Sequence, residues 1–200
     1  MFNTVNADAF AEFNKATQVI VPSSIDFDAF ADAQAMMGLE SLEGVEFFAF
    51  VSPADVAALR KALKTSLQYV EAFARSGYVG TVAGVNVYTK KDAVSGTIIV
   101  ATREAVTIFN KKGVEVAQPA RSNDEENIRQ NWVYTRKYYI AALTNETRAV
   151  KMMVGATATA TQDTTVNTSK TYYAASGLGY VAVVPAAGAN PKTSGWYEIA

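Results

Sequence analysis

The sequence predicts a fold of the α+β class, with a small β-rich module in its last part. Three observations lead to this prediction. Apolar residues recur at helical spacing in the first 75 residues. From residue 78 onward, short β-branched and aromatic runs alternate with glycines. After residue 155 the composition changes to alanine, threonine and glycine. A chain of 200 residues, half of them apolar, is long enough for one sizeable core and a small satellite module.

Two helices are predicted before residue 40. A weak apolar stripe indicates a first helix over Asn6–Gln18, which Pro22 separates from the next. The second helix is expected to begin with Ser24 as its N-cap and to end at Gly38. Its apolar stripe has spacings of three and four residues, which is typical of a core-facing helix, and consists of Phe27, Phe30, Gln34 and Met37.

A strand and a well-marked helix start follow. Val45–Val51 is predicted to be a strand that is covered on both sides, because Phe47 and Phe48 point to opposite faces. Ser52 is a hydroxyl N-cap, Pro53 occupies the first helical position, and an acid follows in the first turn. This helix is expected to reach about Lys64. A further helix is predicted from residue 66 to residue 75.

The remainder is predicted to be β structure. Short strands are expected over residues 78–82, 85–89, 97–101 and 105–109. A turn at Lys111–Gly113 should close a hairpin onto residues 114–116. A long strand is predicted over Ile128–Leu143, with Tyr134, Arg136, Tyr138 and Ile140 on one face, and another strand over Arg148–Val154. Residues 155–200 should form two or three short strands around the tyrosines, with a turn at Asn190 and Pro191.

The composition argues against most enzyme chemistry. The chain contains no cysteine and no histidine, which removes the usual zinc ligands, thiolate nucleophiles and the commonest general base. A phosphate-binding glycine loop is also absent from the sequence. We therefore predict that the chain is not an enzyme and has no catalytic residue, no cofactor-binding residue and no metal ligand. Without a basic stretch followed by an apolar run at the start, we expect a soluble chain that has no membrane partner.

Three motifs have both a functional and a structural interpretation. The first is an acidic cluster on a loop, Asp124, Glu125 and Glu126. It could hold a hard cation, but carboxylates at consecutive loop positions are usually solvated. The second is the acidic group Asp26, Asp28 and Asp32. A hydrolase could use such a carboxylate pair, but acids are also favoured in the first turns of a helix. A third run interleaves basic and aromatic residues as single-strand nucleic-acid binders do, or forms a half-buried sheet face: Arg129, Trp132, Tyr134, Arg136, Lys137, Tyr138 and Tyr139.

Charge is divided unevenly along the chain. Residues 1–50 contain eight Asp or Glu and only Lys15, whereas residues 51–151 contain fifteen Lys or Arg and nine acids. Such a division suits an assembly whose subunits meet through complementary faces, although solvated surfaces can also differ by chance. We predict that Asp8–Glu46 lies against a basic surface of a neighbouring subunit.

Four segments, in this order, resemble the carboxy-terminal half of tailed-bacteriophage major capsid proteins. They read GVEFFAFVSPADVAALRKALK, YVGTVAGVNVYTKKDA, GTIIVATREAVTIFNKKGVEV and YTRKYYIAALTNETRAVKM. The resemblance covers about residues 25–154 and implies the axial and peripheral domains of a capsid-type fold. It further implies that residues 1–24 are similar to the end of the family's spine helix with a linker. Residues 155–200 resemble small modules that are found on phage structural proteins.

The resemblance implies a structural protein of a bacteriophage capsid, a self-assembling shell subunit in the virion that is assembled in the host cytoplasm. Its partners would be other copies of itself and other capsid chains, with packaged DNA contacted only indirectly. A decoration or binding module of a phage head or tail is the alternative, and a carboxylate-dependent hydrolase is a more distant one.

The family's amino-terminal arm, extended loop and most of its spine helix are not matched in this sequence. We therefore expect either a fragment of a longer protein or one chain of a shell that is built from two. On its own, the chain is expected to form monomers or small rings in dilute solution. Closed particles should appear only when a chain that supplies the arm and loop is added.

Overall fold

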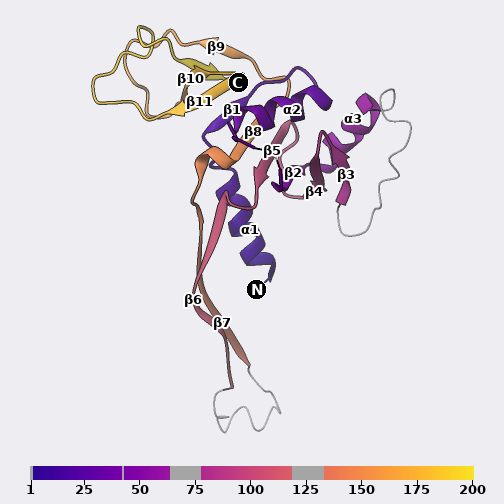
Figure 1. Ribbon diagram of the computed structural model, residues 1–200. Helices are drawn as coiled ribbons and strands as arrows, with labels where there is room; N and C mark the ends of the chain where they lie inside the picture. Colours follow the sequence, from indigo (N-terminus) through magenta and orange to yellow (C-terminus); the bar gives the residue numbers. More distant parts are fainter. Residues whose placement is uncertain (1, 42, 64–77, 119–132) are drawn as a thin grey trace.

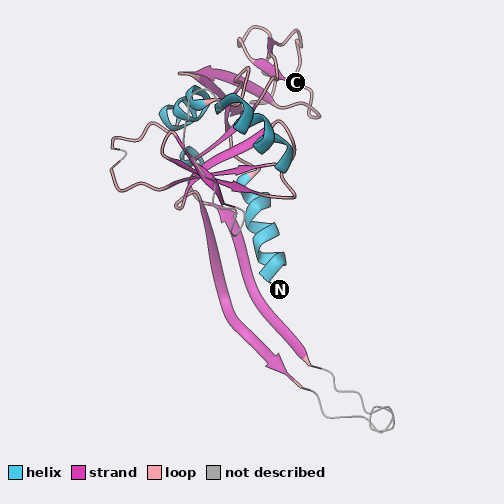
Figure 2. Ribbon diagram, turned by 90° about the vertical axis from the view of Figure 1, so that its right-hand side faces the viewer, coloured by secondary structure: helices cyan, strands magenta, loops and turns pink. Residues whose placement is uncertain are grey.

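A computed structural model describes residues 2–41, 43–63, 78–118 and 133–200 (Figure 1). It consists of a mixed body of helices and strands, from which a long two-stranded hairpin projects on one side (Figures 1 and 2). A group of strands from the last part of the chain lies at the end of the body opposite the hairpin. Within the described residues no helix combines the length and apolar character that a membrane crossing requires.

The described residues form three α-helices, α1 (Phe2–Phe13), α2 (Phe27–Met36) and α3 (Pro53–Leu63). α1 ends five residues before the predicted Gln18, because residues 18–20 form a strand instead. The predicted N-cap of α2 is wrong by two residues: the Asp26 carboxylate accepts from the Ala29 amide at 2.9 Å. Ser24 supports this cap by donating its hydroxyl to Asp26 at 2.8 Å. The helix predicted over residues 66–75 lies outside the described residues.

The prediction for the start of α3 is confirmed. The Ser52 hydroxyl oxygen accepts from the Asp55 amide at 3.2 Å, which is the hydrogen bond that an N-cap residue makes. Pro53 occupies the first helical position, where its missing amide hydrogen costs nothing. The acid that was placed in the positive first turn is Asp55, and it is buried.

Ten strands form one continuous mixed sheet, in the order β3-β4-β2-β5-β8-β1-β11-β10-β12-β9. The body contributes the first six of these: β3 (Tyr78–Val82), β4 (Val85–Thr89), β2 (Phe47–Val51), β5 (Thr97–Thr102), β8 (Ala149–Met153) and β1 (Gln18–Ile20). A short 3₁₀ helix, Glu146–Arg148, precedes β8. The strands that were predicted over residues 78–102 and 148–154 are therefore confirmed, apart from small shifts at their ends.

The core lies on both faces of this sheet. On one face α2 and α3 pack over alternate residues of the strands, for example Phe30 and Leu59 against Val100. On the opposite face Phe10 of α1 and Ala16, which follows α1, form an apolar cluster with Ile99 and Ala101, the neighbours of Val100 along β5. Alternation along β5 thus sends successive side chains into two separate apolar clusters, as expected for a strand that is covered on both sides.

Residues 155–200 form four strands, β9 (Ala158–Ala160), β10 (Tyr172–Ser176), β11 (Gly179–Val183) and β12 (Tyr197–Ile199). Two or three were predicted. These strands extend the body sheet through β1, which pairs parallel with β8 on one side and antiparallel with β11 on the other. The Ala182 amide also donates to the Thr17 carbonyl at 2.8 Å. The last part of the chain is thus hydrogen-bonded to the part around residue 18.

The projecting hairpin is a second sheet, formed by β6 (Val106–Ala117) and β7 (Tyr134–Leu143). The predicted turn at Lys111–Gly113 is wrong, because β6 continues straight through these residues. The register of β6 against β7 shifts on both sides of Lys112. Gly113, which the sequence suggested as part of a turn, therefore lies in an irregular stretch of the strand. Of the long strand that was predicted over Ile128–Leu143, the part from Tyr134 is confirmed, and residues 128–132 lie outside the described residues.

Candidate functional site

The hairpin of β6 and β7 is the part of the molecule whose described residues are least covered by the rest of the chain. It forms a sheet of two strands only, and it extends beyond the body in both views (Figures 1 and 2). Two-stranded hairpins are marginally stable in water, and their outer edges present unpaired backbone groups. The described arrangement therefore favours a partner on the hairpin, either on its faces or along its edges.

One face of the hairpin, here called the outer face, points away from α1 and combines apolar and basic side chains. Residues that are directly opposite in an antiparallel pair share a face, which places Ile140 beside Phe109 and Tyr138 beside Lys112. Phe109 is 51% exposed, Tyr138 47% and Ile140 63%. Arg136 and Tyr134 continue the same face toward the far end of β7. A contiguous patch of large apolar side chains that is exposed in a single chain usually marks a surface that another molecule covers.

The inner face of the hairpin is supported by α1. The Tyr139 hydroxyl donates to the Asp8 carboxylate of α1. This acceptor raises the pKa of Tyr139 above its ordinary value, because an ionised phenolate would lose the hydrogen bond and repel the carboxylate. The Lys137 ammonium lies 5.5 Å from the centre of the Tyr139 ring. α1 thus fixes the base of the hairpin and leaves the outer face free.

The hairpin is basic. Its described residues carry four cations, Lys111, Lys112, Arg136 and Lys137, and the single acid Glu115. Lys112 forms an ion pair with Glu115, whereas Lys111 and Arg136 form no ion pair within the described part of the chain. The interleaved basic and aromatic run that was predicted from the sequence therefore divides between the two faces. Arg129 and Trp132 of that run lie outside the described residues.

The structure does not arrange Asp26, Asp28 and Asp32 as a catalytic or metal site. Asp26 caps α2, and the hydrogen bonds from Ala29 and Ser24 hold the pKa of its carboxyl below the ordinary value. Asp28 and Asp32 are exposed on α2. Asp124–Glu126 lies outside the described residues. Among the residues that are described, no group of three acids, histidines or cysteines is arranged to hold a metal ion.

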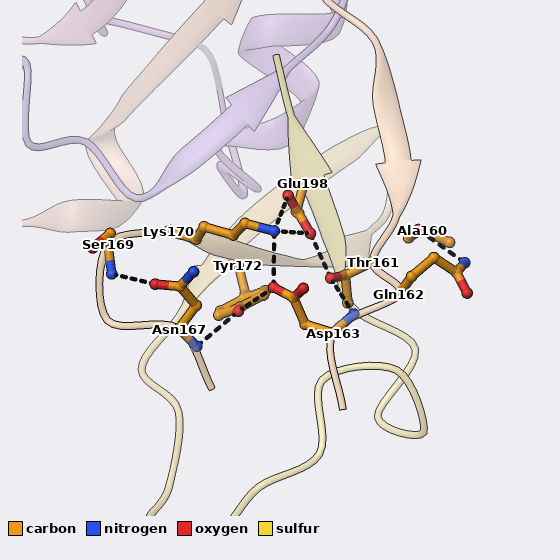
Figure 3. Close-up of polar contacts among 9 residues, drawn as sticks. All are labelled: Ala160, Thr161, Gln162, Asp163, Asn167, Ser169, Lys170, Tyr172 and Glu198. Atoms are coloured by element: carbon orange, nitrogen blue, oxygen red, sulfur yellow. Dashed lines mark hydrogen bonds and ion pairs between the residues drawn. The ribbon is translucent and has the colours of Figure 1, made fainter. Parts of the chain in front are cut away.

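A polar cluster among the last strands was not anticipated (Figure 3). The Lys170 ammonium lies 2.9 Å from the Asp163 carboxylate and 3.1 Å from Glu198 of β12. The hydroxyl of the fully buried Tyr172 donates to Asp163 at 2.7 Å. These contacts tie the loop after β9 to β10 and β12. Every charge has an opposite partner and the cluster borders no described cavity, so we interpret it as a structural clasp.

Comparisons with known proteins support one fold. No family model matches the chain, and no curated protein matches it. Solved structures do: a chain of Mycobacterium phage Che8 is 15% identical, with a TM-score of 0.55 over 76% of this chain and 59% of its own length. The capsid of an empty GTA particle gives 13% identity and a TM-score of 0.56, over 76% and 63%. The mature capsid of bacteriophage PhiM1 gives 13% and 0.54, over 76% and 60%. The chain thus spans about three fifths of the length of these relatives.

Proposed function

We propose that this chain, which has the α+β fold of phage capsid proteins, is a shell subunit of a bacteriophage capsid or a large part of one. The observation that carries the proposal is the outer face of the hairpin. It presents Phe109, Tyr138 and Ile140 to solvent on an element whose base is supported by α1. In a shell, a neighbouring copy would cover this face and pair its edges.

The proposed role is structural and not enzymatic. Polar side chains of the described residues serve as caps and clasps: Ser52 caps α3, and Asp163 accepts from Lys170 and Tyr172. The partners would be other copies of this chain and other capsid chains, with packaged DNA contacted only indirectly and no membrane involved. The site of action would be the virion, after assembly in the host cytoplasm.

For the domain organisation we propose an end of a spine-like helix in residues 1–24, a capsid-type body in residues 25–154, and a terminal module in residues 155–200. The terminal module is joined to the body by backbone hydrogen bonds, because its strand β11 pairs with β1.

A second candidate is a decoration or binding module of a phage head or tail. The position of β9–β12 at the end of the molecule opposite the hairpin favours it, because that end would stay accessible when the hairpin is engaged (Figure 1). Val184 in this region is 94% exposed and Leu178 is 61% exposed.

Sedimentation velocity over a range of concentrations, followed by electron microscopy, separates the two candidates. Phe109→Ser with Ile140→Ser should abolish self-association while leaving thermal unfolding unchanged. The matched control, Leu178→Ser with Val184→Ser, removes exposed apolar side chains from the terminal module and should associate like the original chain. A chain that stays monomeric up to millimolar concentration, alone and with added capsid chains, would exclude the shell subunit. If only the control variant loses association, the decoration module is favoured.

A further inference from the structure

We infer that the basic hairpin docks on an acidic surface of a neighbouring copy, formed by α2 and the loop that follows it. The inference rests on the proposed function and identifies which two surfaces meet. It is narrower than a general attraction between the acidic first part of the chain and basic neighbours, because the structure shows which acids are free.

The segment that forms the acidic surface contains no Lys or Arg. Between Lys15 and Arg60 the chain has seven acids and no Lys or Arg. Two of these acids are committed within the chain, because Asp26 caps α2 and Asp55 is buried at the start of α3. The other five have exposed side chains: Asp28, Asp32, Glu40, Glu43 and Glu46. Only Glu46 forms an ion pair among the described residues, with Arg103 at 3.8 Å.

A cavity of about 660 Å³ adjoins these acids and contains an unsatisfied polar group. Its lining includes Glu40, Glu46 and Thr102, together with the two cations Arg103 and Arg148. Thr102 is only 3% exposed, and its hydroxyl oxygen has no hydrogen-bond partner. Buried hydroxyl groups are nearly always hydrogen-bonded. A lysine or arginine side chain that entered this cavity would face the carboxylate of Glu40, which forms no ion pair among the described residues, and would compete with Arg103 for Glu46.

The hairpin cannot supply that side chain to its own body. It extends away from the body, whereas α2 lies within the body, as both views show (Figures 1 and 2). Its unpaired cations, Lys111 and Arg136, are therefore directed toward other molecules. Because the hairpin and the acidic surface of one chain are separated, the cations of the hairpin can neutralise these acids only between copies, which would link each subunit to the next.

Apolar and charged contacts would have different roles in this interface. Phe109, Tyr138 and Ile140 would supply the area that is removed from water, and the charges would select and orient the partner. A polyanion such as single-stranded DNA is a competing occupant of the same face, because aromatic and basic side chains also bind single strands. DNA binding at the hairpin would leave the acidic surface of α2 without a role. A second copy accounts for both surfaces, and we therefore favour it.

Charge reversal with rescue tests the inference. The hairpin variant is Lys111→Glu with Arg136→Glu, and the acidic-surface variant is Asp32→Lys with Glu43→Lys. All four side chains are exposed and none forms an ion pair in the described structure, so both variants should fold normally. The control, Lys91→Glu with Lys192→Glu, makes the same charge change at exposed sites outside the hairpin.

Each reversed variant alone should associate at least about tenfold more weakly than the original chain, and an equimolar mixture should recover to within about threefold, because opposite charges then meet again. The control should associate normally. Normal association of either reversed variant, or a mixture that fails to recover, would overturn the inference but leave the proposed function intact. Loss of single-stranded DNA binding by the hairpin variant without loss of association would also overturn it. A wild-type chain that stays monomeric at high concentration, alone and with added capsid chains, would reject the proposed function itself.

Discussion

Gly179 of β11 lies so close to Val19 of β1 that a Cβ atom at position 179 would stand 2.4 Å from the Val19 carbonyl oxygen. It would also stand 2.8 Å from a methyl carbon of Ile20. Only glycine permits this approach, which lets the last strands pair with the body sheet. The backbone contact cannot be relieved by a change of rotamer.

We therefore expect Gly179→Ala to lower the free energy of unfolding by about 2 kcal/mol or more, because the strands must separate to admit the methyl group. Chemical denaturation measures this loss. Gly113→Ala is the matched control, since a Cβ atom at Gly113 meets nothing within 4 Å. Equal stability of the two variants would contradict the close approach.

Asp55 joins the start of α3 to the loop before β5. Its carboxylate accepts from the Ser95 hydroxyl at 2.8 Å, from the Gly96 amide at 2.8 Å and from the Ser52 hydroxyl at 2.9 Å. Asp55→Ala leaves these donors without their acceptor and should cost about 3 kcal/mol of folding free energy. Asp92→Ala, which removes only an exposed ion pair with Lys90, should cost less than about 0.5 kcal/mol. A small effect at Asp55 would show that water replaces the carboxylate.

The clasp around Lys170 predicts a loss of local stability at low pH. Hydrogen bonds from Lys170 and Tyr172 lower the pKa of Asp163, and those from Thr161 and Lys170 lower the pKa of Glu198. Acids with a lowered folded pKa stabilise the fold above their ordinary values near pH 4, and this contribution disappears as the pH falls through the lowered values. The pKa of Lys170 is raised, so its contribution persists until strongly alkaline pH.

Trp196 reports on this change, because its ring packs 5.7 Å from that of Tyr172. In a Trp132→Phe background, Trp196 fluorescence should be constant between about pH 5 and 9 and should change below about pH 4. Lys170→Met should weaken the acid transition. An identical transition in that variant would mean that other carboxyl groups cause it.

Self-association should weaken as salt is added. The basic hairpin and the acidic surface of α2 are solvent-exposed, and the Debye length falls below about 10 Å between roughly 0.05 and 0.5 M salt. Light scattering across this range should show less association at higher salt. Association that is unchanged over the range would argue against a charged interface and for an apolar one.

Local signals predicted the body of the fold well. The start of α3 could be predicted from the sequence because the residues that determine it, the Ser52 cap, Pro53 and Asp55, lie within four positions of one another. The strands between Tyr78 and Thr102 were found because glycines delimit β-branched runs. Asp26 replaced Ser24 as the cap of α2 because both residues are good caps, and only the position of the first helical turn decides between them.

Long-range pairing set the limit of the sequence-based predictions. Lys111–Gly113 has the composition of a turn, but β7 holds these residues in a strand, and that partner lies more than twenty positions away along the chain. The interleaved run on β7 was identified, and its division into an outer and an inner face was predicted by alternation. Its function could not be inferred from the run alone, because exposure depends on how little of the hairpin α1 covers. Nor did any motif link Asp163 to Lys170 and Glu198, whose contact depends on the pairing of β12.

The place of β1 between β8 and β11 determines when this molecule can finish folding. Its three residues leave the ribosome before their hydrogen-bonding partners around Val150 and Val181, which follow much later along the chain. Closing a loop of about 160 residues is slow compared with forming local helices and hairpins. Until then the edges of β1 and β8 stay open, and a nascent chain would have to be shielded from premature pairing with its neighbours on the polysome.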